Sequence, residues 1–137
     1  MKKVLLDTSF ILHAIRNKID FLEEILFMGM TPLLPKQVLR ELKSIVNSKK
    51  KLRFKDEARL ALDLFEKIKN KSKNKDKNKD PKKIKTIDLN EDYVDKGIVR
   101  YAKKHKNIVI ATMDYNLKKQ IKNQKLVVRA GKKLEVV

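Results

Sequence analysis

Four acidic residues stand at positions where a carboxylate is unusual, and together they could hold a metal ion. Asp7 and Asp114 each follow a short apolar run that is typical of a buried strand. If those strands are parallel, both acids lie at the carboxyl ends of a sheet, where open α/β folds bind their ligands. Glu41 and Asp95 each share a helical face with apolar residues, where a carboxylate is costly unless it is paired or bound to a metal.

The donor set restricts the kind of metal. Carboxylate oxygens without histidine or cysteine partners suit hard cations such as Mg²⁺ or Mn²⁺ and do not suit zinc. The chain has no cysteine, and its two histidines, His13 and His105, lack a metal-ligand spacing. Its three glycines form neither a Walker motif nor a dinucleotide-binding loop. The cofactor expected from these residues is therefore Mg²⁺ or Mn²⁺.

Each acid also has a simpler explanation. Asp7 and Asp114 are suited to capping helices, and Asp95 to stabilising a helix dipole from the first turn. Glu41 could reach an exposed edge and pair with Arg40. These explanations weaken when the acids are taken together, because all four meet at one end of the sheet if the strand interpretation holds.

Strands and helices alternate along the chain. Apolar runs predict strands at residues 3–6, 30–34, 84–87, 107–111 and 125–128, with an added edge strand at 133–137. Helical spacing and capping signals predict helices at residues 9–16, 19–28, 35–46, 54–68, 92–105 and 115–122. Such alternation predicts a three-layer α/β fold, with a mostly parallel central sheet of about five strands and helices on both faces.

The 137 residues are expected to form a single domain with a basic loop at about residues 69–83. That segment is nearly all Lys, Asn and Asp, and it contains too little apolar surface to offset the cost of ordering. The apolar run at the N-terminus is too short for a signal peptide, and no stretch is long enough to span a bilayer. A soluble cytoplasmic protein without a membrane partner is expected.

The net charge points to a polyanionic partner. There are 35 Lys and Arg residues against 17 Asp and Glu residues, a formal charge of +18. Such an excess favours nucleic acid as the partner. The alternative is a lysine-rich surface that serves only solubility.

Four segments around the acids resemble the motifs of the PIN-domain nucleases. They are LLDTSFIL at 5–12, PKQVLREL at 35–42, VDKGIV at 94–99 and IATMDYNLK at 110–118. Each segment is short, but their order and spacing together are specific, and they cover nearly the whole chain except the lysine-rich segment. The likeness is closer to the small ribosomal-RNA-processing branch of the family. That branch often has a second Asp where this chain has Lys96, which leaves the number of bound metals open.

The resemblance implies a PIN-like fold and a metal-dependent endoribonuclease that hydrolyses RNA phosphodiester bonds in ribosomal RNA processing. Asp7, Glu41, Asp95 and Asp114 would be both the catalytic residues and the metal ligands. A metal-bound water would attack the phosphorus, so the RNA 2′-hydroxyl would not need to react. The side chains expected to hydrogen-bond the carboxylates or the phosphate, or to cap and close turns, are Thr8, Ser9, Thr112 and Asn116.

The expected partner is RNA, in particular a ribosomal RNA precursor, contacted by Lys118, Lys119 and Lys122 in the basic stretch 116–125. A second copy of the chain and ribosome-assembly proteins are the protein partners considered. Two other functions remain open on the same fold. One is a ribonuclease toxin of a toxin–antitoxin pair, and the other is an RNA-binding ribosome-assembly factor without catalysis.

Overall fold

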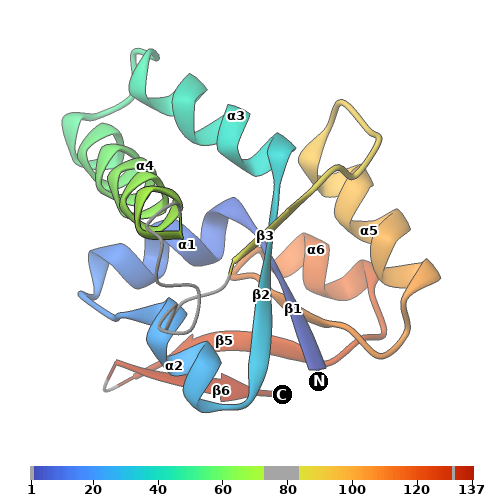
Figure 1. Ribbon diagram of the computed structural model, residues 1–137. Helices are drawn as coiled ribbons and strands as arrows, with labels where there is room; N and C mark the ends of the chain where they lie inside the picture. Colours follow the sequence, from blue (N-terminus) through green and yellow to red (C-terminus); the bar gives the residue numbers. More distant parts are fainter. Residues whose placement is uncertain (1, 73–83, 131) are drawn as a thin grey trace.

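Six strands form one sheet in the order β3-β2-β1-β4-β5-β6 in the computed structural model, which describes residues 2–72, 84–130 and 132–137 (Figure 1). Every neighbouring pair is parallel except β5 and β6, which are antiparallel. The strands are β1 (Lys2–Leu6), β2 (Met30–Pro35), β3 (Lys85–Ile87), β4 (Val109–Ala111), β5 (Lys125–Arg129) and β6 (Lys133–Val136). The predicted α/β fold with a mostly parallel sheet is confirmed, and the edge strand makes six strands where about five were expected.

Helices cover both faces of the sheet. They are α1 (Thr8–Arg16), α2 (Phe21–Phe27), α3 (Lys36–Val46), α4 (Leu52–Ser72), α5 (Val94–Lys104) and α6 (Tyr115–Gln120). Right-handed crossovers place α1 to α4 on one face, because these connections move toward β3, and α5 and α6 on the other. The contacts agree, since α4 packs on α1 and α3 while α5 packs on α6. Figure 1 shows these two groups on opposite sides of the strands.

The two central strands are buried on both faces. Val4, Leu5 and Leu6 of β1 have no exposed surface, and neither has any residue of β4. A parallel strand covered on both sides reads as a continuous apolar run, which is why the sequence predicts these two strands well. The core extends on one side through Phe10, whose ring packs edge-to-face on Phe21 at 5.9 Å.

The strand order reverses between β1 and β4, and this junction positions the site. Chain connections leave β1 toward one edge and β4 toward the other, so the loops that follow these strands part and leave a crevice at their carboxyl ends. The main-chain N–H of Asp7 still donates to the carbonyl of Ala111 at 2.9 Å. The residues immediately after β1 and β4 are therefore held side by side.

The prediction of a basic loop at residues 69–83 is wrong for its first four residues. Residues 69–72 belong to α4, which ends at Ser72. The remainder of that prediction, residues 73–83, lies outside the described residues. Within the described part of the chain, no helix is long and apolar enough to cross a membrane.

Candidate active site at the carboxyl end of the sheet

A hollow of about 270 Å³ lies at the carboxyl ends of the central strands. Residues from four distant segments line it: Asp7, Ser9, Glu41, Tyr93, Val94, Asp95 and Asp114. The hollow thus includes all four acids that the sequence singled out. Within residues 2–72, 84–130 and 132–137, however, no three Asp, Glu, His or Cys side chains are close enough together to hold a metal ion as they stand.

Asp7 is the most buried of the four acids and the most fully hydrogen-bonded. Its side chain is at the start of α1, where Oδ1 accepts from the main-chain N–H of Thr8 at 2.9 Å. Oδ2 accepts from the hydroxyls of Ser9 and Thr112, both at 2.7 Å. Only 3% of Asp7 is exposed. Capping and the suggested metal-binding role are therefore not exclusive, because one carboxylate can cap α1 and face the hollow.

The two hydroxyls that bind Asp7 are themselves oriented by the main chain. Ser9 Oγ accepts from the N–H of Met113 at 3.0 Å, and Thr112 Oγ1 accepts from the N–H of Asp114 at 3.1 Å. Each main-chain donor leaves its hydroxyl proton free to point at the Asp7 carboxylate. Hydrogen bonds in such chains polarise one another, so the arrangement stabilises negative charge on Asp7.

Burial nevertheless makes Asp7 a weak acid. The pKa of Asp7 is raised from 3.8 to about 6. Desolvation by burial is the main cause, the hydrogen bonds from Thr112 and Ser9 oppose it, and the negative charges of Asp95 and Glu41 add smaller upward contributions. The pKa of Asp95 is also raised, first by desolvation and then by the charge of Asp114. The negative charges of the four acids therefore repel one another across the hollow. A cation bound in the hollow would reduce this repulsion.

Asp114 enters the hollow from the start of α6. Its Oδ1 accepts from the main-chain N–H groups of Asn116 at 2.9 Å and Leu117 at 3.3 Å. This is the N-cap geometry, and it fixes the carboxylate at the carboxyl end of β4. One oxygen is used by the cap, so the second oxygen is available to a ligand.

Glu41 and Asp95 are exposed, which corrects the expectation that they lie on buried helical faces. The buried stripe of α3 runs through Val38, Leu42 and Ile45, and Glu41 stands at its edge. The stripe of α5 runs through Val94, Ile98 and Ala102, with Asp95 again at the edge. At the rim both residues are exposed while they line the hollow, although the Asp95 carboxylate is partly desolvated there.

The segment before α5 is tied to α3, so Glu41 and Asp95 are positioned together. The side chain of Gln37, on the first turn of α3, donates to Asp88 at 2.8 Å and accepts from the N–H of Leu89 at 3.2 Å. Gln37 is 4% exposed, so this is a buried link between the elements that carry the two acids. The hydrogen bond from Gln37 also lowers the pKa of Asp88.

Gly97 allows the segment before α5 to pack closely against that helix. A Cβ atom at this position would lie 2.9 Å from both Cβ and Cδ1 of Leu89 and 3.3 Å from Cβ of Glu91. A real Cβ does not approach that closely, so α5 packs on this segment only because residue 97 has no side chain. Neither Gly97 nor Gln37 was singled out from the sequence as a positioning residue.

The remaining predicted neighbours of the acids differ in what they do. Ser9 and Thr112 hydrogen-bond Asp7 as described, whereas Thr8 contacts it through the main chain only. The hydroxyl of Thr8 is buried and, among the described residues, is the buried side-chain oxygen without a hydrogen-bond partner. Asn116 reaches Asp114 through its main-chain N–H, and its side chain is exposed.

The lysines predicted to contact RNA lie on and just after α6. Lys119 is exposed, with its Nζ 4.3 Å from the ring centre of Tyr115, and Lys122 is exposed beyond the end of the helix. Lys118 is half-buried. Tyr93 was missed by the sequence analysis. It lines the hollow and is 67% exposed, and an aromatic residue directly before a helix that carries an acid was its only signal.

Comparisons with known proteins agree with this geometry. A family model described as "PIN domain" matches residues 4–130. Ribonuclease VapC4 of Methanocaldococcus jannaschii is 28% identical over 143 residues, covering 99% of this chain and 97% of that protein.

Two solved structures share the fold. The PIN domain endonuclease Utp24 superposes with a TM-score of 0.66 at 24% identity, over 98% of this chain and 90% of that one. A domain of a functionally unknown protein from Methanocaldococcus jannaschii gives a TM-score of 0.59 at 20% identity, over 100% of this chain and 99% of that one.

Proposed function

The chain belongs to the PIN-domain family, and on that premise we propose that it is a metal-dependent endoribonuclease. The observation that carries the proposal is the hollow at the strand-order reversal, lined by Asp7, Glu41, Asp95 and Asp114. The relative that is 28% identical along almost the whole chain is named a ribonuclease, which supports RNA as the substrate.

The four carboxylates fit a hard divalent cation. The donor set of the hollow offers oxygen ligands and neither imidazole nor thiolate, which suits Mg²⁺ or Mn²⁺. The negative charges of Asp95 and Glu41 contribute to the raised pKa of Asp7, after burial, and a bound cation would offset them. Asp7, Glu41, Asp95 and Asp114 would hold the cation. When bound, it lowers the pKa of a water molecule and neutralises charge that develops on the phosphoryl oxygens.

The chain's own groups prepare this chemistry. Ser9 and Thr112 fix the orientation of the Asp7 carboxylate by donating to its Oδ2. Asp7 must be deprotonated to act as a ligand, and the two hydroxyls favour that state. Asp114 is held by its cap at the start of α6, and Asp95 lies in the first turn of α5.

Ribosomal RNA precursors are the substrate class that we favour. The formal charge of +18 exceeds what solubility needs. Two exposed lysines follow Asp114 in the chain, Lys119 on α6 and Lys122 just after it. A large folded RNA offers many phosphates to such a surface. The toxin alternative requires a dedicated inhibitory protein. The alternative of a non-catalytic RNA-binding factor does not explain why all four acids face one hollow.

The experiment is to incubate the purified protein with ribosomal RNA precursors in Mn²⁺ or Mg²⁺, and in chelator. The protein should cut at a few defined positions with metal and none without it. Because water is the attacking group, a substrate with a single 2′-deoxynucleotide at the cut position should still be cleaved. Cleavage that needs that 2′-hydroxyl, or that persists in chelator, would refute the metal-dependent hydrolysis. Equal cleavage of unrelated messenger RNA would favour the toxin alternative.

A further inference from the structure

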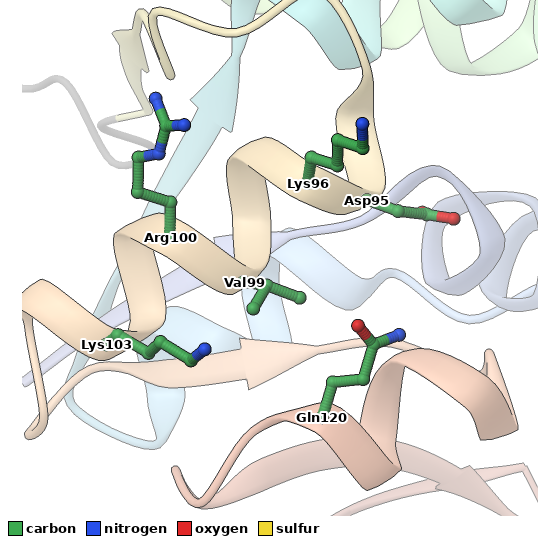
Figure 2. A pocket seen from close by; sticks show the side chains of 6 residues that line it. All are labelled: Asp95, Lys96, Val99, Arg100, Lys103 and Gln120. Carbon is green, nitrogen blue, oxygen red and sulfur yellow. The ribbon is translucent and has the colours of Figure 1, made fainter.

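A second hollow, of about 500 Å³, lies between α5 and α6. It adjoins the acidic hollow at Asp95, which lines both. We call the second hollow the α5–α6 groove. It is lined by Asp95, Lys96, Val99, Arg100, Lys103 and Gln120, as Figure 2 shows.

The α5 side of the groove is a cationic stripe that leads away from Asp95. Lys96, Arg100 and Lys103 are separated by four and three residues, so they lie along one face of the helix. The stripe spans about 10 Å at 1.5 Å of rise per residue. That length corresponds to about three nucleotides of a stacked strand at roughly 3.4 Å each. The acidic hollow and the stripe therefore have opposite charge within the length of a short RNA segment.

The groove also has an apolar and a polar wall. In Figure 2 the side chains of Lys103 and Gln120 extend toward the groove from opposite helices, with Val99 between them. Gln120 is oriented by a hydrogen bond from its Nε2 to the carbonyl of Asn116 at 3.2 Å. Its remaining amide proton and its carbonyl oxygen form an adjacent donor and acceptor. That pair matches the edge of an unpaired base.

We propose that the α5–α6 groove binds the nucleotides on one side of the cleaved phosphate, with Lys96 and Lys103 on backbone phosphates and Gln120 on a base edge. The inference rests on the proposed function, since it takes the acidic hollow as the point of cleavage. Arg100 is already paired with Glu91 at 3.3 Å. Lys96 lies over the ring of Tyr93, with its Nζ 5.4 Å from the ring centre, which leaves its charge unneutralised. The two lysines are therefore the cleaner test of phosphate binding.

The test compares two double variants that each remove two positive charges, one from α5 along the groove and one from the end of α5 and the turn after it. Lys96→Ala with Lys103→Ala removes the groove lysines. Lys104→Ala with Lys106→Ala removes lysines that line a different hollow, near Tyr101 and Ile108. Both are made in an Asp114→Asn background, and affinity for a short single-stranded oligoribonucleotide is measured against salt without metal. The groove variant should flatten the slope of log K against log salt by about 1.4, because each lost phosphate contact contributes about 0.7.

The control variant should leave that slope close to the parent value, and Lys103→Arg should retain it. If both double variants flatten the slope equally, the proposal that RNA binds in the α5–α6 groove is wrong, because the lysines would then act only through the net charge. Gln120→Ala should lower cleavage about fivefold or more for RNAs with the preferred base at one position, and not for the others. Slopes that differ as expected in a protein that cleaves no RNA would support the groove and refute the proposed function.

Discussion

The Thr112 hydroxyl donates to Asp7 Oδ2 at 2.7 Å, and this contact joins the residues that follow the two central strands. Thr112 has no exposed surface, and its oxygen also accepts from the N–H of Asp114. One hydroxyl thus connects two of the four acids of the hollow. Because the contact couples β1 and β4 at the point where the strand order reverses, stability and site geometry depend on it together.

Thr112→Val should destabilise the protein by about 1–3 kcal/mol, since it removes a buried donor and leaves the Asp114 N–H without that acceptor. Thr8→Val is the matched control. Its hydroxyl is buried without a partner, so a methyl group in its place should leave the free energy of unfolding unchanged or raise it. Urea unfolding of both variants measures the difference. If both variants lose the same unfolding free energy, the hydrogen bonds of the Thr112 hydroxyl do not stabilise the fold.

Asp7 should make the chelated protein less stable as the pH rises. The carboxyl loses its proton near pH 3.8 when unfolded and near pH 6 when folded, so the folded state binds the extra proton between these values. Its stabilising contribution is complete below pH 3.8 and is lost through pH 6, a change of about 3 kcal/mol at most. Asp7→Asn removes this dependence. The unfolding free energy of the variant minus that of the parent should therefore rise from pH 4 to pH 7, because only the parent loses this contribution.

A flat difference across that range would show that burial does not raise the pKa of Asp7. Variant and parent are compared at each pH, because acids that are not coupled to Asp7 then affect both proteins equally, and the coupled pair Asp95 and Glu41 adds a smaller contribution. The same substitution keeps the shape of the side chain. An amide can still accept from the N–H of Thr8, so the fold should be retained.

Divalent cations should stabilise the parent through the hollow. A ligand at 100 times its dissociation constant adds about 2.7 kcal/mol to the folded state. Melting temperature measured across millimolar Mn²⁺ should therefore rise for the parent, and rise much less for Glu41→Gln or Asp95→Asn. Glu23→Gln, on α2, is the control and should respond as the parent does. A parent that melts at one temperature at all Mn²⁺ concentrations would argue against tight binding.

Gly97→Ala should disturb the site without touching an acid. The new methyl would meet Leu89 at 2.9 Å, and the residues before α5 would have to move away. Overpacking of this kind costs about 1–3 kcal/mol. Because the shift displaces Asp95 relative to Glu41, Mn²⁺ should stabilise the variant less than the parent. Urea unfolding with and without Mn²⁺ tests both effects, and a variant equal to the parent in both would show that the contact is loose.

The sequence predicts what depends on local pattern. The central strands are buried on both faces and read as apolar runs, and the acids that follow them are visible for that reason. Helical spacing correctly indicated which side of each helix carries Glu41 or Asp95. It did not show that each acid stands at the exposed edge of that side. A residue one step from a buried stripe can be exposed, and both acids are.

Contacts between distant segments were not predictable in the same way. The Gln37 link to Asp88 and the approach of Leu89 to Gly97 depend on how α3 and α5 are placed across the sheet. The end of α4 was also misjudged. Lysine has a good helix propensity, and the helix continues past the buried Ile68 to Ser72, where composition alone indicated a loop.

The most direct test of the central claim is the cleavage rate of Asp114→Asn on an RNA that the parent cuts, at saturating Mn²⁺. Asparagine is as good an N-cap as aspartate, so α6 and the fold should be kept while one negative ligand is lost. Asp20→Asn, which replaces the capping acid of α2 far from the hollow, is the control. Asp114→Asn should cleave roughly 100-fold more slowly or worse while it still binds RNA, and Asp20→Asn should cleave at the parent rate. Cleavage by Asp114→Asn at the parent rate would contradict a catalytic site in the acidic hollow.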